Sequence, residues 1–270
     1  MSGIVDLMAD GRVKHDGVEQ GSVAWWGHAT VAVALNRTTV LTDPVLTNRV
    51  GHLVRRRGER PPASVLAPDA VLLSHLHADH THLPSLRLLA RSVPIVLPLG
   101  APRRLPALRR LGCPLIELTV GDSVEIGNLR VSAVPAEHDG RRWRHGARDV
   151  EALGYTIEGS TLVYFAGDTA LFDAMSEWVP TCELALLPVG GWGPSLGSGH
   201  MDPRSAATAA SAVQARMSIP IHYGTFWPAG LARVRPHLFR DPGESFAAEA
   251  TLLGRSTVVL DPGGTWPLPR

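Results

Sequence analysis

The sequence predicts an α/β protein, in which two sheets are covered by helices within a single domain. Short apolar strands fall into two groups along the chain, and helical segments are interleaved with or follow each group. No linker separates the groups, so we assign one domain to residues 1–270, with a core at about 22–262. A hydrophobic content of 44% and a charged content of 19% are typical of a folded globular chain.

The first group of strands begins with an apolar segment at Ser22–Leu35, which we predict to be one strand. A turn at Asn36-Arg37 leads to its partner at Thr39–Thr42. The remaining elements of this group are a buried strand at Ala70–Ser74, a helix at Leu83–Ala90, a strand at Val93–Pro98 and a helix at Pro102–Arg110.

The second group begins with a predicted meander from Leu115 to Pro135, because turn residues divide its alternating pattern. Further strands are predicted at Leu153–Glu158, Thr161–Ala166, Glu183–Pro188, Ile219–His222 and Thr257–Leu260. Asp202-Pro203 predicts the start of a helix that runs to about Arg216. Asp241 and Glu244 indicate a capping box at the start of another helix.

Charge and cysteine content exclude several classes of protein. The net charge is +1 and the pI is about 8.0, so no nucleic-acid partner is expected. No apolar run is long enough for a transmembrane segment, and the first residues do not resemble a signal peptide. Cys113 and Cys182 match no metal-binding spacing, which favours reduced thiols in a cytoplasmic protein. The oligomeric state stays open.

A histidine cluster follows the predicted strand at Ala70–Ser74. The stretch SHLHADHTH holds four of the chain's twelve histidines within nine residues. On a helix, His75 and Asp79 would share a face while His77 pointed away, so we expect an irregular loop that lets these side chains converge. The cluster therefore predicts a metal site.

His75, His77, Asp79 and His80 spell H-x-H-x-D-H, and here the sequence resembles the metallo-β-lactamase-fold superfamily of hydrolases. The downstream motifs of that superfamily follow in order, at gaps of 58, 30 and 54 residues from His80 onward. They are His138 in AVPAEHDG, Asp168 in YFAGDT and His222 in IPIHYGTF, each placed after a predicted strand.

The resemblance implies a four-layer αββα sandwich and a site for two divalent metal ions. By carry-over, the ligands of one ion are His75, His77 and His138, those of the other are Asp79, His80 and His222, and Asp168 bridges them. Imidazole and carboxylate ligands without a thiolate suit Zn²⁺, our default, and also Mn²⁺ or Fe²⁺. His82 is surplus to the pattern, and we expect it to be solvated rather than a ligand.

Such a site would use a metal-bridging hydroxide to hydrolyse an ester-type bond. Asp79 and His200 are the candidate catalytic residues. Asp43 in LTDP resembles the acidic residue beneath the metals, although a turn aspartate before proline would look the same. The stretch GHAT with His28 resembles a branch that includes ascorbate-phosphate lactonases and N-acyl-phosphatidylethanolamine phospholipase D-like proteins. In that branch His200, in GSGHMDP, would face the active site as an acid or a phosphoryl ligand; otherwise it only precedes a helix.

Loops near the ligands suggest how a substrate is held. Arg141, Arg142 and Arg144 follow His138, and such a cluster would attract a phosphate or carboxylate, unless it is only a solvated loop. Trp192 and Phe226-Trp227 either form an apolar wall of the pocket or pack beneath their loops. The arginine-rich segment Arg55–Arg57 is expected to be a loop near the entrance.

We therefore predict a dinuclear metal-dependent hydrolase acting on a small, anionic substrate, with a phosphodiester or phosphorylated molecule preferred. A lactonase, or a carboxylic-ester or thioester hydrolase, is the alternative that uses the same site. From another class, a protein that binds metal or ligand without catalysis is the remaining alternative.

Overall fold

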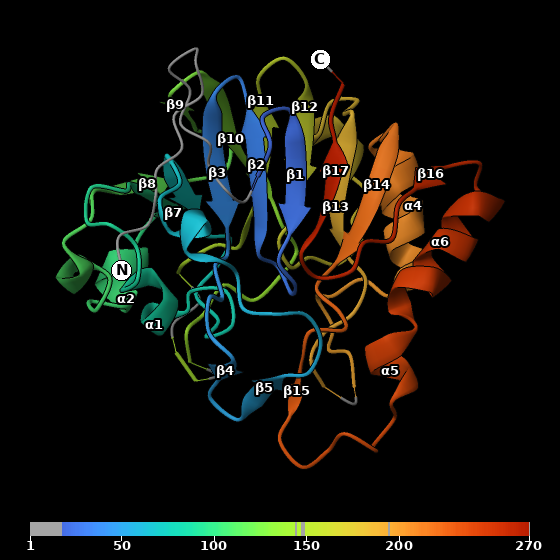
Figure 1. The fold of residues 1–270 in the computed structure, drawn as a ribbon. Helices are drawn as coiled ribbons and strands as arrows, with labels where there is room; N and C mark the ends of the chain where they lie inside the picture. The colour runs from blue at the N-terminus through green and yellow to red at the C-terminus, as the bar shows by residue number, and fades with distance from the viewer. Residues whose placement is uncertain (1–17, 144, 147–148, 194, 270) are drawn as a thin grey trace, which may run out of the picture.

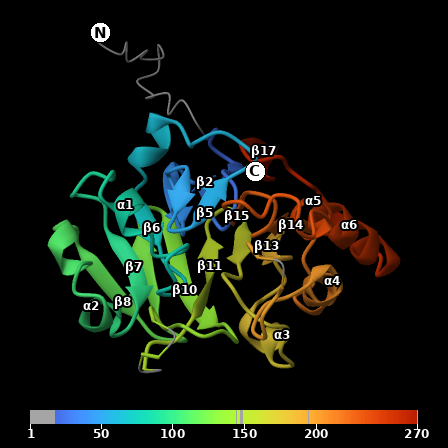
Figure 2. The ribbon, with the colours of Figure 1, turned by 90° about the horizontal axis from the view of Figure 1, so that it is seen from below.

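Two seven-stranded sheets pack face to face, and helices lie on their outer sides (Figure 1). The structure, a computed structural model, describes residues 18–143, 145–146, 149–193 and 195–269. Figure 2, which looks from below, has α1 and α2 on one side of the sheets and α4 and α6 on the other. This arrangement confirms the predicted αββα sandwich. Within the described ranges no helix is long and apolar enough to span a membrane.

The first sheet has the strand order β17-β1-β2-β3-β6-β7-β8. Its strands are β1 (Ser22–Trp25), β2 (Val31–Leu35), β3 (Thr38–Thr42), β6 (Ala70–Leu72), β7 (Ile95–Pro98), β8 (Leu115–Leu118) and β17 (Gly264–Pro267). The helices α1 (Leu83–Leu86) and α2 (Ala101–Arg104) and two 3₁₀ turns, at Ala63–Leu66 and Arg109–Leu111, belong to its connections. The strands β3, β6, β7 and β8 run parallel, so their carboxyl ends share one edge.

The second sheet has the order β16-β14-β13-β12-β11-β10-β9. Its strands are β9 (Ser123–Ile126), β10 (Leu129–Pro135), β11 (Leu153–Glu158), β12 (Leu162–Phe165), β13 (Leu184–Pro188), β14 (Met217–Ile221) and β16 (Ser256–Thr257). Four helices lie in this half: α3 (Met175–Trp178), α4 (Pro203–Ala212), α5 (His237–Arg240) and α6 (Pro242–Leu252). The strands β12, β13, β14 and β16 are parallel, and again their carboxyl ends share an edge.

The main core lies between the two sheets, and a second core lies beneath α1 and α2. In β2, Val31 and Val33 belong to the main core, whereas Ala32 between them belongs to the second. This alternation follows from the period of two of a strand, which turns successive side chains to opposite faces. Both faces of this sheet are buried, so the sheet is a rigid support for the loops at its edge.

The predicted strand at Ser22–Leu35 is wrong, because the chain turns in its middle. Residues 26–30 form a tight turn in which the backbone N–H of Trp26 donates to the carbonyl of Thr30 at 2.9 Å. Gly27 and His28 both have positive φ, 95° and 53°. A Cβ on Gly27 would lie 2.6 Å from the side chain of Thr225, so this turn requires glycine for two reasons. The apolar pattern of Ser22–Leu35 is continuous through this turn, so the sequence pattern did not indicate it.

Other boundaries also differ from the predictions. The predicted meander is divided between the sheets, since β8 pairs with β7 and β9 pairs with β10. The expected helix at Pro102–Arg110 is only α2 and a 3₁₀ turn. Asp202 caps α4 through a capping box with Ser205, but Asp241 makes no side-chain cap to α6. The strand β17 lies beyond the expected core limit of 262 and pairs with β1.

A third, small sheet has the order β15-β5-β4 and covers one end of the sandwich. It consists of β4 (Arg49–Val50), β5 (Leu53–Arg55) and β15 (Phe226–Pro228). Figure 1 shows it below the lower ends of the two large sheets. Its own apolar cluster contains Val45, Val50, Leu53 and Phe226, and Trp192 packs against this cluster.

Candidate metal centre

The predicted metal ligands meet because each follows a strand that ends at the same end of the sandwich. His75 lies three residues after β6, Asp168 three residues after β12, and His222 directly after β14. His138 lies three residues after β10, which also ends at this edge. Strand ends bring residues distant in sequence together, because parallel strands start and stop at common edges.

Three imidazole nitrogens form the first group. His77 Nδ1 lies 2.9 Å from His75 Nε2 and 3.2 Å from His138 Nε2. Two nitrogens bound to one zinc ion at about 2.0–2.1 Å, in a tetrahedron, lie about 3.3 Å apart. The three nitrogens therefore have the spacing of ligands that share one cation, and these side chains are one of the clusters able to hold a metal ion.

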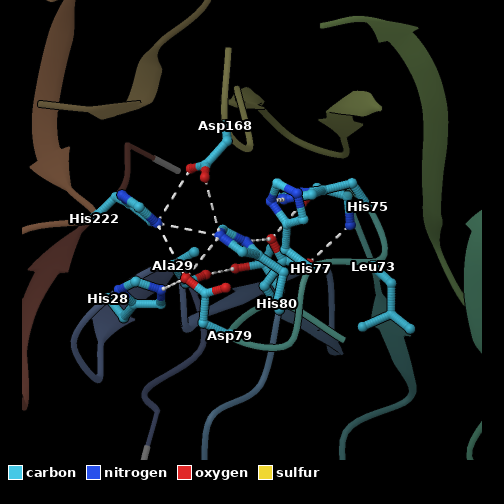
Figure 3. Close-up of polar contacts among 12 residues, drawn as sticks. His28, Ala29, Leu73, His75, His77, Asp79, His80, Asp168 and His222 are labelled. Carbon is cyan, nitrogen blue, oxygen red and sulfur yellow. Dashed lines mark hydrogen bonds and ion pairs between the residues drawn. The ribbon is translucent and has the colours of Figure 1, made fainter. Parts of the chain in front are cut away.

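The second group lies beside the first (Figure 3). His80 Nε2 is 3.1 Å from His222 Nε2, and Asp79 Oδ2 is 3.7 Å from His80 Nε2. Asp168 lies between the groups, with Oδ2 3.1 Å from His80 Nε2 and 3.9 Å from His138 Nε2. Asp168 Oδ1 is buried and has no hydrogen-bond donor. A buried carboxylate oxygen without a donor fits a place between two cations.

The ring nitrogens that face away from the centre are held by other groups. The Nδ1–H of His80 donates to Asp43 at 2.7 Å, that of His138 to the carbonyl of Gly199 at 2.8 Å, and that of His222 to the carbonyl of Gly190 at 2.9 Å. With Nδ1 protonated, the Nε2 of each neutral ring directs its lone pair to the centre. This pattern of acceptors is typical of metal-binding histidines.

Burial and mutual charge set the protonation of these side chains. Burial lowers the pKa of His77 to about 4 and that of His222 to about 3, so both imidazoles are neutral at pH 7. Burial alone would raise the pKa of Asp168, but His222 and His80 lower it well below its ordinary value. Neutral imidazole and ionised carboxylate are the forms that bind cations.

His80 is the exception among the imidazoles. Burial opposes its charge, but Asp168, Asp79 and Asp43 together raise its pKa well above the ordinary value. Without a cation, His80 therefore keeps a proton that neutralises part of the carboxylate charge. A bound cation would displace that proton and take over the same role.

Asp43 and His28 support the second group from below. Asp43 is fully buried and accepts hydrogen bonds from the backbone N–H of Ser74 at 2.8 Å, from Ser74 Oγ at 2.5 Å and from His80 Nδ1 at 2.7 Å. His28 Nε2 lies 2.9 Å from Asp79 Oδ2, and its ring lies 4.1 Å from that of His222. Both residues lie where the sequence predicts supporting groups, and His28 reaches this place only because of the turn between β1 and β2.

Comparison with known proteins agrees with this geometry. Residues 38–223 match the beta-lactamase superfamily domain. The chain belongs to this superfamily. It has the metallo-β-lactamase fold and a His/Asp cluster able to bind metal.

Relatives of this chain come from bacteria, archaea and animals. A UPF0173 metal-dependent hydrolase of Methanopyrus kandleri is 30% identical over 90% of this chain and 98% of its own length. An uncharacterized Mycobacterium tuberculosis protein is also 30% identical, over 85% of this chain, and the matched region spans only 64% of that protein. The N-acyl-phosphatidylethanolamine-hydrolyzing phospholipase D 1 of Caenorhabditis elegans is 29% identical over 92% of this chain and 76% of its own length.

A solved structure agrees on the fold. Igni18, a metallo hydrolase from Ignicoccus hospitalis, superposes with a TM-score of 0.68, at 23% identity, over 92% of this chain and 98% of its own.

A cavity of about 410 Å³ lies beside the His/Asp cluster. His77, Asp79, Asp168 and His222 form its floor, and residues 191–193, 195–197 and 200, which include Trp192 and His200, line it as well. His200 Nε2 is 3.4 Å from Asp168 Oδ2. Burial would lower the pKa of His200, but the contact with Asp168 raises it above the ordinary value. Of the predicted aromatic wall, only Trp192 lines the cavity, whereas Phe226 and Trp227 are buried and do not line it.

The arginine loop after His138 differs from the expectation. The structure does not place Arg141 in this cavity: its guanidinium pairs with Asp139, and its side chain lines a separate cavity of about 150 Å³. Arg142 is half-buried, and its Nη1–H groups donate to the carbonyls of Leu76 at 3.1 Å and Thr81 at 2.8 Å. Arg144 lies outside the described residues. Arg142 therefore braces the loop that bears His75–His80, a role that the charge pattern of the sequence did not reveal.

His82 also differs from the expectation. It is buried rather than solvated, with 5% of its surface exposed, and its Nδ1 lies 2.7 Å from Ser85 Oγ. Burial lowers its pKa to about 4, which keeps the ring neutral. It belongs to none of the clusters able to hold a metal ion among the described residues. His82 therefore helps to anchor the start of α1.

Proposed function

We propose that this protein is a dinuclear metal-dependent hydrolase that cleaves a phosphodiester or a phosphorylated small molecule. One observation carries the proposal: two groups of ligand atoms flank Asp168, whose buried Oδ1 has no donor. The proposed ligands are His75, His77 and His138 for one ion, Asp79, His80 and His222 for the other, and Asp168 for both. Zn²⁺ is the ion we expect, with Mn²⁺ or Fe²⁺ compatible with the same nitrogen and oxygen donors.

A pair of divalent ions in this site would activate water at neutral pH and stabilise negative charge on the group under attack. The side chains of the protein then have distinct tasks. Asp79 holds the second group in place through His28, and Asp43 fixes the tautomer of His80. His200, whose Nε2 lies 3.4 Å from Asp168 Oδ2 and whose pKa that contact raises, is placed to donate a proton to the leaving group.

Two features support a phosphodiester as the bond that is cleaved. The Caenorhabditis elegans relative is named as a phospholipase D, and enzymes of that activity cleave a phosphodiester. His200 lines the cavity and its pKa is raised, so it can interact with a phosphoryl oxygen or protonate an alkoxide. A cavity of about 410 Å³ is the size of a small-molecule site.

A lactonase or a carboxylic-ester or thioester hydrolase is the second candidate, and the composition of the cavity favours it. Among the described residues that line the cavity there is no arginine or lysine, while Trp192 and Leu196 give an apolar side. The negative charge of a phosphodiester or of a phosphorylated molecule would rely on the metal ions and His200 alone. A neutral ester next to an apolar group needs no further cation.

The test combines metal analysis with a hydrolysis screen on one preparation of the full chain. We expect about two divalent ions per chain and turnover of bis(p-nitrophenyl) phosphate. His77→Ala should lose the turnover and the ion that His77 would hold, while the circular dichroism spectrum is unchanged. Turnover of lactones or thioesters alone would select the second candidate. A metal-loaded protein that is inert on all three classes would overturn the proposal in favour of metal or ligand binding without catalysis.

A further inference from the structure

The small sheet and its two flanking loops carry an unusual distribution of charge. We call this region the basic flap and define it as residues 44–58 and 222–240, which contain β4, β5 and β15. It holds seven arginines and no aspartate or glutamate. The rest of the chain then has 19 of the 26 basic residues and all 25 acidic residues. The net charge of +1 therefore conceals a positive flap on an otherwise acidic protein.

Two of the seven arginines make hydrogen bonds or ion pairs with other parts of the chain. Arg55 is largely buried, donates to the carbonyls of Trp26 at 3.1 Å and Val45 at 3.0 Å, and lies over the ring of Phe226. Arg57 pairs with Asp261. Five arginines are exposed on the flap: Arg49, Arg56, Arg233, Arg235 and Arg240.

Apolar side chains are interleaved with these cations in the loop that follows β15. Every residue from Ala229 to Arg235 is exposed, including Leu231 at 39% and Val234 at 42%. The loop lies beside the turn between β4 and β5, because the N–H of Ala229 donates to the carbonyl of His52 at 3.0 Å. Figure 1 shows this loop and turn at the lower end of the molecule, away from the large sheets.

We propose that the basic flap docks on an anionic lipid bilayer. Peripheral membrane binding has two requirements: aliphatic side chains that enter the interface, and cationic side chains that contact the anionic headgroups. A single-stranded nucleic acid would favour exposed aromatic rings on which bases stack, and Phe226 and Trp227 are buried. The attraction acts locally, since charges more than about 8 Å apart are screened at physiological salt.

The flap adjoins the mouth of the metal-centre cavity. The ring of His52 lies 5.3 Å from that of Trp192, which packs against the apolar cluster of the flap and also lines the cavity. A docked flap therefore holds the cavity next to the bilayer surface. Docking itself requires neither metal nor hydrolysis, so it can be tested whatever reaction the centre performs.

The experiment is co-sedimentation of the full chain with vesicles. We expect binding to vesicles of equal parts phosphatidylglycerol and phosphatidylcholine, and none to pure phosphatidylcholine. The double variant Arg233→Gln with Arg235→Gln should weaken binding about 30-fold. Each arginine next to an anionic membrane surface strengthens binding by a similar factor, about five- to sixfold. Leu231→Ser with Val234→Ser should weaken it about tenfold. All four side chains are exposed, so these variants should keep the melting temperature of the wild type.

Matched controls come from other surfaces of the same chain. Arg109 and Arg110 are exposed, and Leu252 is 81% exposed at the end of α6. Changing these to glutamine and serine should leave vesicle binding intact. The proposal is overturned by equal binding to both vesicle types, by control variants that bind as weakly as the flap variants, or by flap-dependent binding of single-stranded DNA without binding of vesicles.

Discussion

Replacing Asp43 by asparagine should weaken metal binding although Asp43 is itself no predicted ligand. Asp43 is a buried acceptor for three donors, two from Ser74 and one from His80 Nδ1. An asparagine keeps the shape and can still accept from the backbone of Ser74, but its NH₂ group cannot accept from His80. The imidazole must then carry its proton on Nε2, where the lone pair for the metal is required.

The expected loss follows from the role of such supporting groups. Removing the hydrogen-bond acceptor of a metal-binding histidine typically costs about 10–100-fold in affinity, which is about 1.4–2.7 kcal/mol. The loss of a hydrogen bond to a buried charged group also lowers the free energy of unfolding of the metal-free protein by about 1.5–3 kcal/mol. Both effects come from a single oxygen atom.

The assay is competition for Zn²⁺ between the protein and a chelator of known affinity, with chemical denaturation of the metal-free protein beside it. Asp69→Asn is the matched control, because Asp69 also accepts from a backbone N–H, that of Thr39 at 2.7 Å, but lies at the exposed start of β6. We expect this control to bind zinc as the wild type does. An Asp43→Asn variant with zinc affinity within threefold of the wild type would refute the tautomer argument.

Three further predictions concern other residues. Arg142→Met should lower zinc affinity about tenfold in the same competition, because the loop between Leu76 and Thr81 loses its brace, whereas Arg141→Gln should not. His200→Gln should lower kcat about 10²–10⁴-fold with metal content unchanged; if metal content falls instead, His200 is a ligand and not an acid. Cys182 is buried and its pKa is raised to about 12, so Ellman's reagent should label Cys113 alone in the folded protein, and labelling of two thiols without denaturant would contradict this.

Predictions from sequence were most accurate where the signal is local. The strand β11 has the predicted bounds, and the metal motif falls after β6 as expected, because short apolar runs and a dense cluster of ligand residues are read within a few positions. Errors arose where a partner distant in sequence decides the structure. The split between β8 and β9 depends on which sheet each strand joins, and β17 depends on β1, to which it returns across almost the whole chain.

The same distinction separates the ligands from their supports. The sequence alone determined the types and order of the seven candidate ligands. A cation binds only certain side chains, and these residue types can be recognised in the sequence before the backbone conformation is known. Only the tertiary structure decided what Arg142 and His82 do and how His28 reaches the centre. Arg142 contacts carbonyl groups about 60 positions away, and His28 enters through a turn that Thr225 helps to shape. Backbone acceptors and close contacts of this kind leave no pattern in side-chain order, since every residue has a carbonyl group and only folding decides which ones lie within reach.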